Sequence, residues 1–461
     1  MRPSLLLTLL FVGGLAWSAD VVLPDYERIE LENGAVLLLS EKHDVPLIGL
    51  QALLRGGGVT DPADKAGLTE LLATVMQKGA GGRDAAEFAA ASAGVGGRLS
   101  VSPGAEAVTV SAEFLSRDTE LMIELVADLL LRPTLAEGEF VKERERSIGL
   151  IKAAKDADPN DLMPYYANGF LFGEHPYGSP TIGSESSLAT IEHDDLVAHY
   201  EDHFGGDRLI VSVVGDFDLA ALKARLSAVF GAWEPAAGDL PLVPAPESMP
   251  GPRVLLVDKP GATQTYFWFG GAGVAIDYPH RAELNLANTV FGGRFTSMLV
   301  TELRVNAGLT YRVRSAVDRR SQPGSVTIRS FTETGKTAET IDLAISVLGR
   351  LHDSGLDDAM MVSARNYIMG QFPPRLETGS AVAEMLAFLE QHGLDRSYID
   401  GYGAALTAAT RDSVAQSIGE VYPDREGLVF VIIGDADVIR DEVTKYGPVT
   451  EMSITEPRFR L

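Results

Sequence analysis

An apolar ten-residue segment occurs twice in this chain, and this repeat constrains the fold more than any other feature. Residues 209–218 read LIVSVVGDFD, and residues 428–437 read LVFVIIGDAD. Each copy is an unbroken apolar run that ends in a Gly-Asp turn, which is typical of a strand buried on both faces. A helical pattern precedes each copy, at 194–203 and at 410–421. The repeat therefore predicts two halves with the same fold.

A proline-rich segment separates the two copies. Residues 235–252 contain six prolines, a composition typical of an extended linker. A chain of 461 residues is also too long for one hydrophobic core. We therefore expect an N-terminal half over residues 19–234, a linker over residues 235–252 and a C-terminal half over residues 253–461.

Strand and helix signals are mixed within the halves. Asn33-Gly34 lies between two strand-like segments and predicts a β-hairpin over residues 26–40. Residues 113–131 and 135–154 have helical patterns, and Pro133 separates them. Hairpins beside pairs of long helices predict an α+β fold, in which each homologous half layers helices on a sheet.

The first 18 residues have the pattern of a secretory signal peptide. Arg2 precedes an apolar run, and Ala16-Trp17-Ser18 offers small residues for cleavage before Ala19. The run is short for a membrane span, although an uncleaved anchor is the alternative interpretation. We expect a periplasmic or secreted protein with no stable membrane insertion after cleavage.

Composition excludes several classes of function. The chain has no cysteine, so it can form neither disulfides nor thiolate metal sites. Its net charge of −25 disfavours binding to nucleic acid and to anionic lipid. We therefore expect no nucleic-acid partner.

Residues 65–80 read KAGLTELLATVMQKGA. This segment resembles the helix that carries the His-x-x-Glu-His zinc motif in the pitrilysin and insulinase family of zinc peptidases, the inverzincins. Segments similar to others of that family follow in the same order: Gly96-Gly97, residues 175–178 (HPYG) and the two Gly-Asp strand ends. The resemblance covers nearly the whole mature chain and implies a duplicated, processing-peptidase-like fold.

The resemblance also shows what this chain lacks. The family's first histidine ligand falls on Glu70, its general-base glutamate on Ala73 and its second histidine on Thr74. The third ligand, a glutamate in the family, falls on Leu150. Zinc in such sites needs three side-chain ligands, and Glu70 alone supplies one oxygen. We expect no metal and no catalytic residue in this chain alone.

A pair of histidines elsewhere offers an alternative metal site. His199 and His203 are four residues apart on a predicted helix, and Asp202 lies beside the second histidine. The pair is either a relocated metal site or part of a solvated helix face. No third ligand is evident, which favours the solvated face.

Residues 301–311 read TELRVNAGLTY. They resemble the family segment in which an arginine and a tyrosine hold the substrate backbone near the zinc, which here would be Arg304 and Tyr311. A guanidinium and a phenol hydroxyl can bind a peptide carbonyl and stabilise an oxyanion. The alternative is a surface ion pair at Arg304 and a core aromatic at Tyr311. The resemblance further implies that an extended peptide lies along a sheet edge at residues 97–103.

Some family members divide these two roles between two chains, and this sequence resembles the type without zinc. We expect a non-catalytic subunit of a heterodimeric periplasmic zinc metallopeptidase. It would supply Arg304 and Tyr311 to a homologous partner that carries the zinc, and the substrate would be an extended peptide. Two alternatives stay open: a catalytically inactive peptide-binding or scaffold protein of the same fold, and an enzyme with a different active site.

Overall fold

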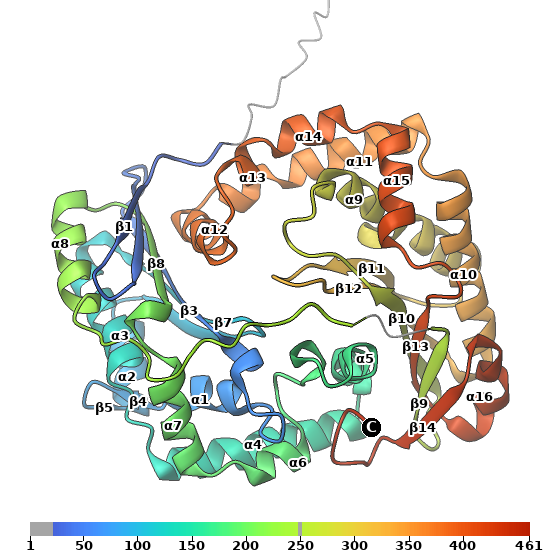
Figure 1. Ribbon diagram of the computed structural model, residues 1–461, viewed down its shortest axis with the longest axis horizontal. Helices are drawn as coiled ribbons and strands as arrows, with labels where there is room; N and C mark the ends of the chain where they lie inside the picture. Colours follow the sequence, from blue (N-terminus) through green and yellow to red (C-terminus); the bar gives the residue numbers. More distant parts are fainter. Residues whose placement is uncertain (1–21, 248–250) are drawn as a thin grey trace, which may run out of the picture.

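The computed structural model describes residues 22–247 and 251–461, and within them the chain forms two six-stranded mixed sheets (Figure 1). The predicted signal peptide over residues 1–18 lies outside the described residues. In the first sheet the strands are β1 Glu27–Glu30, β2 Val36–Glu41, β3 Leu47–Arg55, β6 Arg98–Pro103, β7 Ala107–Leu115 and β8 Leu209–Gly215. In the second sheet they are β9 Arg253–Asp258, β10 Gln264–Ala272, β11 Val313–Asp318, β12 Ser325–Glu333, β13 Val429–Gly434 and β14 Val449–Ser453.

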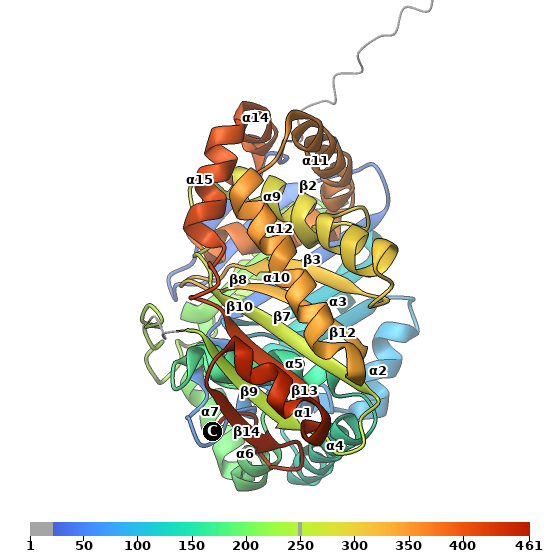
Figure 2. The same ribbon diagram turned by 90° about the vertical axis from the view of Figure 1, so that its right-hand side faces the viewer.

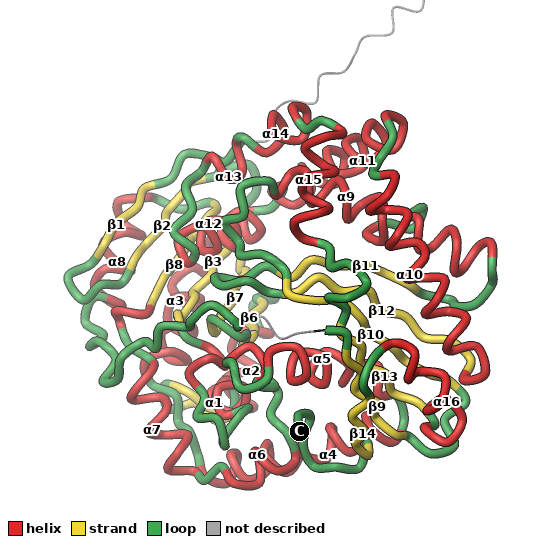
Figure 3. The backbone as a smooth tube through the Cα atoms, turned by 45° about the vertical axis from the view of Figure 1, so that its right-hand side comes forward, coloured by secondary structure: helices red, strands yellow, loops and turns green. Residues whose placement is uncertain are grey.

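Helices surround both sheets (Figure 3), which confirms the predicted α+β class. Those of the N-terminal part are α1 Leu68–Met76, α2 Ala85–Ala93, α3 Thr119–Leu131, α4 Glu137–Asp156, α5 Met163–Phe172, α6 Glu185–Thr190, α7 His193–His203 and α8 Leu219–Phe230. Those of the C-terminal part are α9 Arg281–Asn288, α10 Thr337–Ser354, α11 Asp358–Gln371, α12 Gly379–Gln391, α13 Ser397–Asp400, α14 Tyr402–Ala408, α15 Arg411–Val421 and α16 Ala436–Val443. Figure 2 shows α10, α15 and α16 on the outer side of the second sheet. Within the described residues, no helix combines the length and the apolar content that a bilayer crossing requires.

The two copies of the sequence repeat form β8 and β13, which occupy equivalent places in their sheets. The strand orders are β1-β2-β8-β3-β7-β6 and β14-β9-β13-β10-β12-β11. Strand β8 pairs parallel with β2 and antiparallel with β3, and β13 pairs in the same way with β9 and β10. Every residue of β8 and β13 is buried, as an unbroken apolar run requires. The sheets differ at one edge, where β1 pairs antiparallel with β2 but β14 pairs parallel with β9.

The hairpin predicted over residues 26–40 is confirmed by the pairing of β1 with β2. The helix predicted over residues 113–131 is wrong at its start. The alternating burial of β7 continues the strand to Leu115, and α3 begins only at Thr119. The Thr119 hydroxyl donates to the Ser116 carbonyl at 2.7 Å in the turn between them. A period of two residues therefore prevails over the helical pattern in this segment.

The two sheets exchange a helix. Helix α5 precedes the linker but packs on β10 and β13, while α12 follows it and packs on β3 and β8 (Figure 1). The contact at α12 is close: a side chain at Gly49 would meet the Ser380 backbone at 2.7 Å, so only glycine fits in β3 at this point. Each sheet therefore buries one face against a helix from the other half of the sequence.

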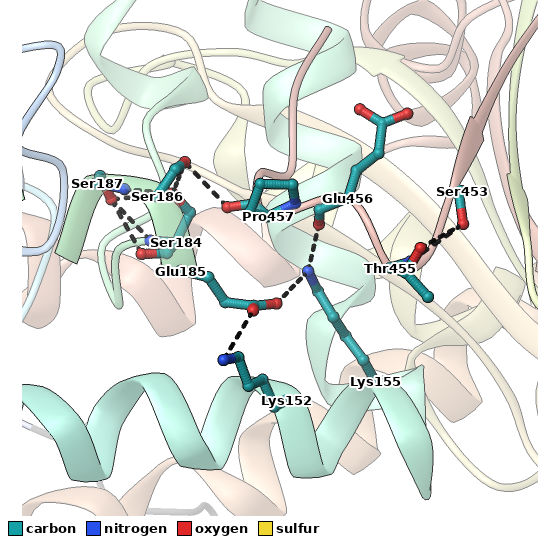
Figure 4. A network of polar contacts seen from close by, with 10 residues as sticks. All are labelled: Lys152, Lys155, Ser184, Glu185, Ser186, Ser187, Ser453, Thr455, Glu456 and Pro457. Atoms are coloured by element: carbon teal, nitrogen blue, oxygen red, sulfur yellow. Dashed lines mark hydrogen bonds and ion pairs between the residues drawn. The ribbon is translucent and has the colours of Figure 1, made fainter. Parts of the chain in front are cut away.

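The C-terminal tail adds a second link between the halves (Figure 4). The Lys155 ammonium donates to the Glu456 carbonyl and, at 2.8 Å, to the Glu185 carboxylate. Phe459 is fully buried and meets the Tyr166 ring edge-on, with centroids 4.9 Å apart. The end of the expected C-terminal half thus packs on the N-terminal half.

Candidate functional site

Helix α1, which the sequence aligns with the zinc helix, is fixed at its N-terminus by a buried aspartate. Asp61 accepts hydrogen bonds from the backbone N–H of Gly67 at 2.8 Å and of Thr69 at 2.9 Å. It also accepts from the Thr69 hydroxyl at 2.6 Å. Burial raises the pKa of the Asp61 carboxyl to about 7, against the lowering effect of these hydrogen bonds. The helix is therefore well held, although its zinc positions are changed.

The four aligned zinc positions do not supply a ligand set. Glu70 is partly buried, and burial raises the pKa of its carboxyl. Ala73 is fully buried, and Thr74 donates its hydroxyl to the Glu70 carbonyl at 2.9 Å. Leu150 projects from α4 with 60% of its surface exposed and offers no donor atom. One carboxylate is too few for zinc, so these residues do not fit the metal and no hydrolytic step can be assigned to them.

The sequence analysis did not identify the ion pair that joins α4 to the segment directly after α1. Glu143 is 8% exposed, lies seven residues before Leu150 on the same helix, and accepts from Lys78 at 2.9 Å. Arg146 also pairs with this carboxylate at 3.2 Å. Arg146 lies on α4 itself, whereas Lys78 lies directly after α1, so Glu143 links α4 to the C-terminal end of α1. Among the described residues, no group of three or more His, Asp or Glu side chains is arranged to hold a metal ion.

The favoured interpretation of the His199–His203 pair, a solvated helix face, is wrong for His199. Its side chain is buried against the start of α1, with Nε2 2.9 Å from the Thr69 hydroxyl and 3.7 Å from Asp61 Oδ1. Burial, and then the charge of His203, lowers the pKa of His199 to about 3, so the ring is neutral at pH 7. The two imidazole rings lie 4.6 Å apart. His199 therefore fixes α7 against α1.

The structure brings Arg304 and Tyr311 together. Arg304 lies in a π-helical segment, Val300–Asn306, and its guanidinium carbon is 4.5 Å from the centre of the Tyr311 ring. Phe295, which sequence reasoning did not single out, covers Arg304 at 4.8 Å. Tyr311 is 73% exposed, which excludes the alternative of a core aromatic. Within the described residues Arg304 forms no ion pair, since the nearby Glu302 pairs with Arg350 at 2.9 Å.

The chain reversal between these two residues explains the contact. Gly308 has a φ of 63°, a left-handed conformation that favours glycine. The Leu309 N–H donates to the Leu303 carbonyl at 2.8 Å, and both leucine side chains are buried. The two leucines anchor the turn and leave Arg304 and Tyr311 on its outer side.

The predicted sheet edge at residues 97–103 is present. Strand β6 pairs with β7 along one side and forms the end of the first sheet. Because β6 is the last strand of this sheet, the backbone groups on its other side can pair with another extended chain. Its residues alternate between exposed and half-buried. A side chain at Gly97 would meet the Phe114 ring at 2.4 Å, which explains the glycine where β6 begins.

Comparison with known proteins agrees with this architecture. A profile described as insulinase (peptidase family M16) matches residues 37–185, and one described as peptidase M16 inactive domain matches residues 190–368. An uncharacterized zinc protease of Mycobacterium leprae is 28% identical over 323 residues, 68% of this chain and 71% of that protein. The non-peptidase homolog YmxG of Helicobacter pylori is 23% identical over 355 residues, 75% of this chain and 79% of that protein.

Solved structures share the fold. A peptidase M16 inactive domain from Pseudomonas fluorescens superposes with a TM-score of 0.83 at 20% identity, covering 89% of this chain and 98% of that one. A protease from Helicobacter pylori gives a TM-score of 0.82 at 18% identity, covering 89% of this chain and all of that one. These matches and the two sheets confirm the resemblance drawn from the sequence: the chain belongs to peptidase family M16, the insulinase family, and it has Glu70, Ala73, Thr74 and Leu150 at the aligned zinc-motif positions.

Proposed function

We propose that this chain is the non-catalytic subunit of an exported two-chain zinc metallopeptidase, in which a homologous partner carries the zinc. The observation that carries the proposal is the arrangement of Arg304, which lies between the rings of Phe295 and Tyr311 and has no carboxylate partner among the described residues. The aligned zinc positions on α1 and α4 meanwhile offer no ligand set. The chain thus keeps substrate-holding groups where it lacks hydrolytic ones.

The stacking suits Arg304 for binding a peptide carbonyl. Two aromatic faces restrict the guanidinium to one orientation while its N–H groups stay available at the rim, which lowers the entropy lost on binding. The Tyr311 hydroxyl lies on the same exposed surface and adds a neutral donor. Together they form a pre-organised pair that could stabilise negative charge on a substrate oxygen.

Strand β6 supports a peptide as the substrate. Its unpaired edge can take up an extended chain by strand addition, with backbone hydrogen bonds providing affinity that is largely independent of sequence. The half-buried positions of β6 alternate with exposed ones, so every second side chain of a bound peptide would lie on the more buried face of the sheet.

Reconstitution tests the proposal. The mature chain would be co-expressed with a homologue from the same genome that has an intact His-x-x-Glu-His motif, and the two would be assayed for co-purification and for cleavage of a peptide library. We expect a one-to-one complex that cleaves peptides, with zinc held by the homologue and neither chain efficient alone. A homologue that is fully active alone and unaffected by this chain would refute the shared site and favour the scaffold alternative.

A further inference from the structure

A polar pocket in the C-terminal half is lined by residues of α9, α11, α12, α13 and α14. Figure 1 shows how these helices are arranged. Its volume is about 420 Å³, and neither Arg304 nor Tyr311 lines it. Its walls contain three arginines and three tyrosines: Arg281, Arg319, Arg375, Tyr367, Tyr398 and Tyr402. This combination of cations and hydroxyls is unrelated to the zinc positions and to the substrate-holding pair.

Among the described residues, no carboxylate neutralises the three arginine charges. The chain has 64 Asp and Glu residues, yet none of the described residues lining the pocket is acidic. Within residues 22–247 and 251–461, no carboxylate forms an ion pair with Arg281, Arg319 or Arg375. Burial raises the pKa of the Tyr402 hydroxyl, and the charges of all three arginines act against this rise. Like charges gathered in this way repel one another unless an anion joins them.

The hydrogen-bonding groups are also unbalanced towards donors. The Nη1 atom of Arg319 is buried and has no hydrogen-bond partner in the described part of the chain. Tyr402 accepts from the Asn285 amide at 2.6 Å, and no acceptor for its own proton is present among the described residues. Buried donors without acceptors are costly, so a ligand that accepts several hydrogen bonds would be bound favourably.

Arg281 is already positioned for such a ligand. Its guanidinium carbon lies 3.3 Å from the centre of the Tyr398 ring and 4.6 Å from that of Tyr402. Burial lowers the pKa of Arg281, and the charge of Arg319 acts in the same direction. The two rings hold the guanidinium plane in place, which favours bidentate binding of a planar or tetrahedral oxyanion.

We propose that this pocket binds a small multivalent oxyanion, either a phosphate group or a compact di- or tricarboxylate. The volume lies within the range of small-molecule sites. Helix α12 contributes Met385 and Phe388 to the pocket, while its neighbouring residues Val382 and Leu386 pack on the first sheet. A bound anion would therefore also strengthen the packing of the helix that joins the halves.

Calorimetric titration of the full mature chain tests the proposal, with inorganic phosphate and citrate as separate probes in a low-salt buffer. We expect saturable one-to-one binding of at least one probe and a rise in the thermal midpoint with its concentration. Binding of phosphate alone would identify the phosphate class, and binding of citrate alone the carboxylate class. Absence of saturable binding of both probes at millimolar concentration would overturn the proposal.

Substitutions locate the binding. Arg319→Gln and Arg375→Gln should each weaken binding at least tenfold, while Arg411→Gln, the same charge change at an exposed site outside the pocket, should leave it unchanged. Arg375 is exposed, so its variant should fold even if changes at Arg319 disturb packing. Equal affinity in all three variants would show that the anion binds elsewhere and would refute the site.

Discussion

Tyr311→Phe and Arg304→Ala change the proposed oxyanion donors without touching the core. Tyr311 is 73% exposed, and the phenylalanine ring retains the stacking on Arg304, so folding and pairing with the zinc subunit should be unaffected. Removal of one oxyanion donor typically lowers kcat by roughly 10²–10³, about 2.7–4 kcal/mol. We expect each variant to lose activity in this range, mainly in kcat if the contact tightens in the transition state.

Phe295→Ala separates positioning from chemistry. It leaves both donors in place but removes one of the two rings that hold Arg304. An exposed cation–π contact is worth about 0.5–1 kcal/mol, which corresponds to a loss of roughly two- to fivefold in rate. Arg304→Lys keeps the charge but loses the planar fork, so it should lie between Phe295→Ala and Arg304→Ala.

The assay is turnover of a fluorogenic peptide by the reconstituted two-chain complex at matched concentrations. Arg350→Ala is the matched control, since it removes an equal charge from the neighbouring ion pair with Glu302 and contacts neither Tyr311 nor Phe295. Unchanged turnover in both Arg304→Ala and Tyr311→Phe would refute the shared-site reasoning. An equal loss in Arg350→Ala would show that the effect is a general one of charge.

Four further outcomes follow from the structure. Elemental analysis of the purified chain should find no stoichiometric zinc. Of the changes that restore the motif, Ala73→Glu should lower the unfolding free energy by several kcal/mol in urea because it buries a carboxylate. Leu150→Glu changes a 60% exposed site and should leave the unfolding free energy nearly unchanged. Burial lowers the pKa of His199 to about 3, so its contribution to stability is present above pH 6.5 and is lost as the pH falls towards 3. His199→Gln should reduce the fall in unfolding free energy between pH 6.5 and 3. An unchanged dependence of the unfolding free energy on pH would contradict the buried neutral ring. Phe459→Ala should destabilise the fold by about 3–5 kcal/mol in denaturant titration, and a cost below about 1 kcal/mol would show that the tail is not anchored. Limited proteolysis should cut the exposed stretch at residues 239–247. The two fragments should still co-elute on gel filtration, because the exchanged helices α5 and α12 hold the halves together. Fragments that elute separately would contradict this.

The duplicated fold could be predicted from the sequence because a strand buried on both faces is an unbroken apolar run, which can be recognised locally. The apolar runs of β8 and β13 each report a central strand without reference to the rest of the chain. The exchange of helices α5 and α12 between the sheets has no such local sequence signal. Val382 and Leu386 in α12 have ordinary helical spacing, and this spacing does not indicate that they pack on the first sheet. The partner of an amphipathic face is a property of tertiary structure.

The candidate site could likewise be predicted only where residue types in one segment were enough. The frame around α1 identified Glu70 and Thr74 as changed positions, which needed only residue types. The burial of His199 was missed because the acceptors and donors that surround it, Thr69 and Asp61, lie in a segment far away in the sequence. Phe295 was not singled out because its contact with Arg304 joins two separate segments of the chain, which only the fold brings together.

The arginine pocket marks the point at which sequence patterns fail altogether. Arg281 and Arg375 belong to no motif, and they come together only because α9 and the turn after α11 meet in the fold. What distinguishes them, in a chain of net charge −25, is that no carboxylate in the described part of the chain pairs with them, which only the structure can show. Because Arg304 does not line this pocket, the two proposals can fail separately: Arg304→Ala should leave anion affinity unchanged, and Arg375→Gln should leave turnover unchanged when no anion is added. A change in turnover on anion addition that disappears in Arg375→Gln would then mean that the pocket acts on the partner's chemistry through α12.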